Sequence, residues 1–103
     1  MGNMNRETEI KAQIADVMRR NADKLRGHRV FLFGSRAAGN ARPNSDFDVG
    51  VIGDEPLPLH DFYAIEDQLD TLPTLYEIDW VDFNRVSPRF SERAMRRMEV
   101  IHG

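Results

Sequence analysis

The sequence predicts an α/β domain in which helices pack on one face of a small mixed β-sheet and leave the other face open. Two observations predict it. Several segments carry apolar stripes at helical spacing, and between them lie short segments that are either apolar throughout or alternate apolar with polar residues, as strands do. The expected order is helix, strand, short helix, strand, helix, strand, helix. A chain of 103 residues without a repeat or linker suffices for one modest core. We therefore expect residues 1–103 to form a single domain.

The first helix is predicted over residues 6–25, and Gly27 follows it as a stop signal. Its apolar stripe consists of Ile10, Ile14, Val17, Met18 and Leu25. Residues 30–33 form a bulky apolar run that predicts a buried strand. Gly34 ends this strand, because glycine tolerates backbone angles that other residues avoid. Residues 35–38 are then expected to begin a short helix.

The second strand is predicted over residues 46–52. Side chains alternate between the two faces of a strand, so Asp46 and Asp48 share one face. The other face carries the apolar residues Phe47, Val49 and Val51, which belong in the core. Both carboxylates are therefore expected to point away from the core.

A third helix is predicted over residues 59–72, after a proline-marked loop and before Pro73. Residues 75–83 are the next strand candidate, because aromatic and apolar residues alternate there with acids. Ser87 and Pro88 are typical of a helix N-cap followed by proline at the first helical position. The last apolar stripe, which extends this helix, consists of Phe90, Ala94, Met98 and Ile101.

The turn after the first strand has the features of a phosphate-binding site. The first N–H groups of a helix are unpaired, and at Gly34 and Ser35 they would hold triphosphate oxygens together with the Ser35 hydroxyl. Arg36 and Arg42 would add positive charge there.

Asp46 and Asp48 have the pattern of a metal site. Mg²⁺ takes a few protein carboxylates and leaves the rest of its shell to water and phosphates. Asp is also a common turn residue, so the pair alone would equally fit a surface loop. The predicted strands before Gly34 and after Ser45 favour the metal site.

Gly34-Ser35, a gap of ten residues and Asp46-Phe47-Asp48 together resemble the signature of the DNA polymerase β-like nucleotidyltransferases. The resemblance spans nearly the whole chain, and the short length resembles the minimal (MNT) branch. It implies transfer of a nucleotide from a nucleoside triphosphate, with ATP as the expected donor, to a hydroxyl. It also implies two Mg²⁺ ions, held by Asp46, Asp48 and a third carboxylate on the neighbouring strand.

That third carboxylate is expected in the strand over residues 75–83. Alternation puts Glu77 and Asp79 on the open face, whereas Asp82 lies on the core-facing side near the strand end. We predict that Asp79 is the third catalytic and metal-binding acid, on the ion that activates the acceptor hydroxyl. Asp82 is the second choice and Glu77 the third.

The minimal branch resembles the antitoxins of HEPN/MNT toxin–antitoxin pairs. This resemblance implies a HEPN-domain ribonuclease toxin as the partner in a hetero-oligomer, and transfer of AMP to a tyrosine of that toxin. Two alternatives stay open: a non-catalytic antitoxin that masks its partner by contact, and nucleotidyl transfer to a small molecule. Intact Ser35, Asp46 and Asp48 count against the non-catalytic alternative.

Composition argues against several other classes. The formal net charge of -3 and the pI of about 5.5 disfavour a broad nucleic-acid surface. The chain has no cysteine, so it has neither a disulfide nor a thiolate metal site. No apolar run approaches membrane-spanning length, and a cytoplasmic protein is expected. Four arginines, Arg89, Arg93, Arg96 and Arg97, are expected on the solvated face of the last helix, with a partner-binding surface as the alternative.

Overall fold

The computed structural model describes residues 6–39 and 46–103. The helices in these ranges are α1 (Arg6–Arg20), α2 (Ser35–Ala38), α3 (Leu59–Asp70) and α4 (Pro88–Ala94). The strands are β1 (His28–Phe33), β2 (Phe47–Gly53), β3 (Ile78–Asp82) and β4 (Glu99–His102). None of the described helices combines the length and apolar character that crossing a membrane requires.

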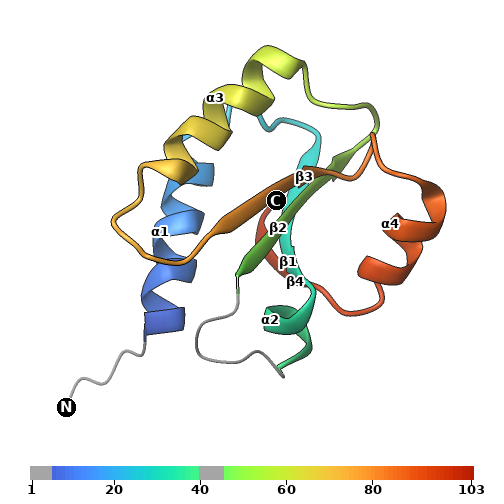
Figure 1. Cartoon of the computed structure of the whole chain (residues 1–103). Helices are drawn as coiled ribbons and strands as arrows, with labels where there is room; N and C mark the ends of the chain where they lie inside the picture. The colour runs from blue at the N-terminus through green and yellow to red at the C-terminus, as the bar shows by residue number, and fades with distance from the viewer. Residues whose placement is uncertain (1–5, 40–45) are drawn as a thin grey trace.

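The strands form one sheet in the order β3-β2-β1-β4 (Figure 1). β1 pairs antiparallel with both β2 and β4, whereas β2 pairs parallel with β3. Two parallel neighbours need a crossover, and α3 supplies it between β2 and β3. The predicted mixed sheet is therefore confirmed.

The main core lies between the sheet and the two longest helices, α1 and α3, which cover the same face (Figure 1). Alternate residues of β1 and β2 point into this core, as the sequence pattern predicts. Its completely buried members include Ile14, Val17, Met18, Val30, Leu32, Phe47, Val49, Val51 and Ile65. Burial of each such side chain contributes about 1.5–3 kcal/mol, which fixes the face on which the acids of β2 remain.

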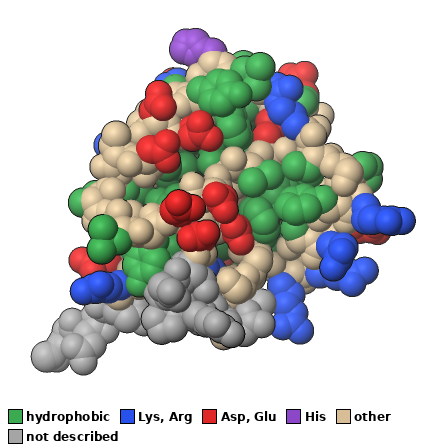
Figure 2. All heavy atoms as spheres, viewed as in Figure 1, with side chains coloured by type: hydrophobic (Ala, Val, Ile, Leu, Met, Phe, Trp, Pro, Cys, Tyr) green, Lys and Arg blue, Asp and Glu red, His purple; other side chains and the backbone are tan. Residues whose placement is uncertain are grey.

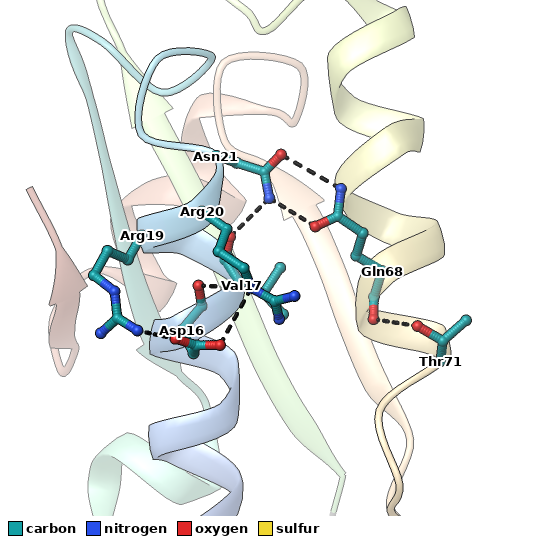
Figure 3. Close-up of polar contacts among 7 residues, drawn as sticks. All are labelled: Asp16, Val17, Arg19, Arg20, Asn21, Gln68 and Thr71. Atoms are coloured by element: carbon teal, nitrogen blue, oxygen red, sulfur yellow. Dashed lines mark hydrogen bonds and ion pairs between the residues drawn. The ribbon is translucent and has the colours of Figure 1, made fainter.

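Two amide side chains, the buried Asn21 and the half-buried Gln68, join the end of α1 to α3 (Figure 3). Asn21 donates from Nδ2 to the Val17 carbonyl at 2.7 Å and to Gln68 Oε1 at 2.9 Å. The backbone carbonyl of Gln68 accepts a hydrogen bond from the Thr71 hydroxyl at 2.9 Å where α3 ends. Because a buried amide without partners is costly, the bond between Asn21 and Gln68 favours one placement of α3 on α1.

The last helix lies on the other face of the sheet. There, Phe31, Phe33 and Phe83 form a second, smaller cluster, and Ala94 and Met95 from the end of α4 pack against it. The expected layering thus holds for α1 and α3, while α4 departs from it. This departure brings α4 to the face that carries the acids.

The strand β4 is absent from the predicted order. The spacing of Phe90, Ala94, Met98 and Ile101 suggests one helix, but α4 ends at Ala94 and the chain returns as an edge strand beside β1. The β-branched pair of Val100 and Ile101 suits a strand. An ion pair between Lys11 Nζ and Glu99 Oε1 at 2.9 Å ties the new edge to α1.

Candidate active site

Two acids meet at the centre of the open face. Asp48 of β2 and Asp79 of β3 are direct partners in the parallel register of these strands. Equivalent positions on adjacent strands point to the same face of a sheet, so both carboxylates stand on the face opposite the main core. Asp48 is half-buried and Asp79 is exposed.

The surroundings of Asp48 oppose its negative charge. The pKa of Asp48 is raised from its ordinary value of 3.8 to about 6, and burial is the largest cause. The charge of Asp79, a hydrogen bond with Asp79 and the charge of Asp46 add to this rise. A carboxyl with a raised pKa beside other acids marks a place where a cation would be stabilised.

The turn after β1 lies against Asp48. The antiparallel register puts Phe33 opposite Asp48, so that Gly34 follows directly beside the carboxyl group. Gly34 adopts a φ of 72°, in the left-handed region that favours glycine. A Cβ at this position would also collide with Asp48 Oδ2. Glycine is thus required both by the backbone angle and by the close approach of the acid.

Asp46 and Glu77 lie at the same end of these strands. Asp46 directly precedes β2, and the N–H of Phe47 donates to the Glu77 carbonyl at 2.9 Å. Both acids are exposed. Among residues 6–39 and 46–103, however, no three acid or histidine side chains already converge in a way that could hold a metal ion. The carboxylate oxygens of these acids are the kind of ligand that Mg²⁺ prefers. Asp48 and Asp79 are already in contact, through a hydrogen bond between their side chains.

Asp82 has a different place. It is 4% exposed and accepts the N–H groups of Leu57 at 3.0 Å and Asn84 at 2.9 Å. Arg85 completes its surroundings, with its Nε 3.5 Å from Asp82 Oδ2. Asp82 therefore anchors the loop after β2 to the end of β3, on the core side of the sheet as alternation predicts. The structure brings Asp79, and not Asp82, beside Asp48.

The structure corrects the expected place of Arg36. Its side chain is 5% exposed and pairs with Glu7 of α1, with Arg36 Nη1 3.0 Å from Glu7 Oε1. The guanidinium also stacks 4.2 Å from the centre of the Phe47 ring, which belongs to the main core. Arg36 therefore fastens the short helix α2 to α1 instead of extending toward the open face. Arg42, the second cation expected at the phosphates, lies outside the described residues.

Two clefts meet on the open face, and Phe33 and Phe90 line both. One, of about 950 Å³, runs along β3 and contains Asp48 and Asp79. The other, of about 860 Å³, opens between α4 and the turn at Gly34 and Ser35. Its basic residues are Arg89, Arg93, Arg96 and Arg97. Figure 2 shows the result: acidic side chains gather at the centre of this face, basic ones at its edge, and apolar surface lies between them.

The sequence pattern does not reveal this basic wall. It places the four arginines on a solvated face, because a helix on the core side of the sheet would point them away from the acids. The placement of α4 on the opposite face brings them to the cleft beside Ser35. Their density over residues 89–97 in an acidic chain is the signal behind the alternative of a binding surface, and their place beside Ser35 favours that alternative.

Together, these features provide acids in one cleft, and Ser35 and cations in the adjacent cleft, with Phe33 and Phe90 lining both. Carboxylates can hold a divalent cation or accept a proton, while a hydroxyl and guanidinium groups can bind phosphate oxygens. The arrangement therefore suits a phosphorylated substrate whose reacting phosphorus lies near Asp48 and Asp79.

Comparison with known proteins gives a family match. The family model described as "Polymerase beta, Nucleotidyltransferase" matches residues 12–103 of the chain. A search of the curated proteins found no significant match.

Several solved structures share the fold. A proposed minimal nucleotidyltransferase is 28% identical, with a TM-score of 0.63, over 94% of this chain and 97% of its own. A toxin–antitoxin crystallised with AMP-PNP has a chain that is 24% identical, with a TM-score of 0.70, over 90% of this chain and 73% of its own. A complex of a tri-AMPylated Shewanella oneidensis HEPN toxin with its MNT antitoxin gives 17% identity and a TM-score of 0.66, over 94% of this chain and 72% of that one.

Proposed function

Because the chain belongs to the polymerase β nucleotidyltransferase family, we propose that it transfers AMP from ATP to a hydroxyl group. The acceptor that we propose is a tyrosine of a partner HEPN toxin. The observation that carries the proposal is the contact of Asp48 with Asp79 beside the turn at Gly34. This arrangement joins the two parts of the sequence motif in one place, although they are separated in the chain.

Mg²⁺ fits the residues of the site. Its ligands are oxygen atoms. The raised pKa of Asp48 reflects burial first and then the negative charge of Asp79 and Asp46, and a bound cation would favour the charged carboxylate against both. We propose Asp46, Asp48 and Asp79 as the residues that would hold it. When bound, Mg²⁺ would neutralise charge on the transferring phosphoryl group.

The residues of this chain would act on both sides of the reacting phosphorus. In the proposed step, the acceptor oxygen bonds to the α-phosphorus, and the bond from that phosphorus to the bridging oxygen of pyrophosphate breaks. Asp79, which is exposed and therefore accessible to an acceptor, receives the hydroxyl proton. Ser35 donates its hydroxyl to an oxygen of the leaving phosphates. Positioning and charge neutralisation would supply most of the rate acceleration, as in other phosphoryl transfers.

The acceptor and the donor are supported by similarity. The similar toxin–antitoxin was crystallised with AMP-PNP, an ATP analogue, and the Shewanella oneidensis complex holds a tri-AMPylated HEPN toxin. For this chain, we propose by analogy ATP as the donor and a tyrosine of the toxin partner as the acceptor. A cytoplasmic location stays a prediction.

The test is intact-protein mass spectrometry of a HEPN protein encoded beside this chain, after incubation with the chain, ATP and Mg²⁺. We expect mass increments of whole adenylyl groups with the wild-type chain. The Asp48→Asn and Asp79→Asn variants should abolish them. Asp67→Asn is the matched control, because Asp67 is an exposed acid on α3 that lines neither cleft.

Each result has a distinct meaning. A stable complex whose masses stay unchanged with wild type and variants alike would contradict catalysis and favour masking by contact. Modification that survives Asp79→Asn but is lost with Glu77→Gln would move the third acid to Glu77. If the partner is neither bound nor modified while ATP is consumed with added alcohols, a small-molecule acceptor replaces the toxin.

A further inference from the structure

Four arginines form a basic wall opposite the turn at Gly34 and Ser35. Arg89 and Arg93 belong to α4, and Arg96 and Arg97 follow its end. We call these four residues the arginine cluster. All of them line the cleft of about 860 Å³ that Ser35 also lines. A concave site with a hydroxyl on one side and several guanidinium groups on the other has the chemistry of an anion site.

The arginine cluster stands out from the charge of the molecule. The chain carries 14 basic and 17 acidic residues, so its average surface does not attract anions. In the described part of the chain, no ion pair includes a member of the cluster, although other arginines pair with nearby acids. Arg36, the cation nearest to Ser35 in sequence, is committed to Glu7. Among the described residues that line this cleft, the cluster thus supplies the basic side chains.

The basic cleft also borders the acidic one. Phe33 and Phe90 line both clefts, and Gly34, on the wall of the basic cleft, lies against Asp48 in the acidic one. One extended molecule can therefore contact both. A nucleotide whose α-phosphorus lies at Asp48 would extend its remaining phosphates past Ser35 toward α4.

We propose that the arginine cluster binds the β- and γ-phosphates of the nucleotide and holds the pyrophosphate as it leaves. This inference rests on the proposed function and assigns the cationic half of the same site. When the bond between the α-phosphorus and the bridging oxygen breaks, its electron pair stays on pyrophosphate, whose negative charge increases. One guanidinium group can donate two parallel hydrogen bonds to two phosphate oxygens, and it remains protonated. It therefore stabilises this charge without accepting or losing a proton.

The test is isothermal titration calorimetry of the full chain with three probes: ATP with Mg²⁺, inorganic tripolyphosphate, and AMP. The variants are Arg93→Gln/Arg97→Gln and Arg89→Gln/Arg96→Gln, and thermal unfolding verifies that they are folded. The matched control is Arg19→Gln/Arg20→Gln, which removes the same charge from the exposed end of α1. In at least one cluster variant, we expect the affinity for ATP and for tripolyphosphate to fall on the order of tenfold, while the affinity for AMP stays unchanged. In the control variant, the affinity for all three probes should stay unchanged.

Several results would overturn the inference. They are unchanged ATP affinity in both cluster variants, an equal loss in the control, or an equal loss for AMP. If the cluster variants bind ATP normally but no longer bind the partner protein, the cluster is a protein-docking surface instead. The proposed function fails separately: ATP would bind in a cluster-dependent way, yet no adenylyl group would be transferred to any acceptor.

Discussion

Asp48 and Asp79 are in direct register across the parallel strands β2 and β3, and burial together with the neighbouring Asp79 raises the pKa of Asp48 to about 6. The fold therefore holds two acids together at a cost in free energy. Such an arrangement is expected where charge serves binding or catalysis instead of stability.

A first prediction concerns pH. In the folded protein without metal, the pKa of Asp48 is raised from 3.8 to about 6, so the folded state binds more protons at this group than the unfolded chain between these pH values. The contribution of Asp48 to stability is therefore greatest below the lower value and is lost as pH rises through the higher one. We expect Asp48→Asn to raise the melting temperature in EDTA near pH 8, and to raise it less near pH 4.

Thermal unfolding across this pH range, followed by circular dichroism, measures the effect. Asp67→Asn serves as the control for removal of an exposed acid. A difference in melting temperature between Asp48→Asn and wild type that does not change with pH would contradict the charge argument.

A second prediction concerns Gly34. Gly34→Ala places a Cβ against Asp48 Oδ2 at a φ of 72°, so it should lower the free energy of unfolding by about 2 kcal/mol or more. Gly39→Ala is the matched control, because Gly39 has a similar φ of 79° but no described atom within 4 Å of the place its new methyl group would take. Urea denaturation compares the two, and equal losses would exclude a role for the contact with Asp48.

A third prediction separates the two acids of β3. Asp82→Ala should lower the free energy of unfolding by about 2–4 kcal/mol, because it leaves the N–H groups of Leu57 and Asn84 without their acceptor. Asp79→Ala should abolish nucleotidyl transfer with little loss of stability, since Asp79 is exposed. Denaturation and transfer assays on both variants check this, and the reverse assignment of effects would make Asp82 the catalytic acid.

A fourth prediction concerns Arg36. Arg36→Met removes the stacking on Phe47 and the ion pair with Glu7, so we expect a loss of about 1–2 kcal/mol in the free energy of unfolding. Arg93→Met, on the exposed side of α4, should change stability much less. The affinity for ATP should show the opposite order. A large loss of ATP affinity in a stable Arg36→Met variant would return Arg36 to the phosphate site.

Local patterns were sufficient for much of the fold. The strand, turn and strand around Gly34 follow from apolar runs and one glycine, and alternation alone puts Asp79 on the open face and Asp82 on the core side. These predictions succeed because burial of the apolar face decides the orientation of every residue in a strand. The roles of the acids in catalysis stay predictions.

The remaining features depend on contacts between distant parts of the chain. Ile101 fits a helical stripe with Phe90, and its place in β4, the strand beside β1, is not visible in that stripe. Arg36 is next to Ser35 in sequence, but its partner Glu7 lies in α1. The place of α4 likewise follows from its packing against Phe31 and Phe83, which decides where the arginine cluster points.

The most direct test of the site at Asp48 and Asp79 is a crystal structure of the chain with AMP-PNP and Mn²⁺, whose anomalous scattering locates the metal. We expect a metal peak between Asp48 and Asp79, the α-phosphate beside it, and the outer phosphates along Ser35 toward the arginine cluster. A nucleotide or metal bound elsewhere, with Asp48 and Asp79 in contact with neither, would contradict the claim that these two acids form a nucleotidyl-transfer site.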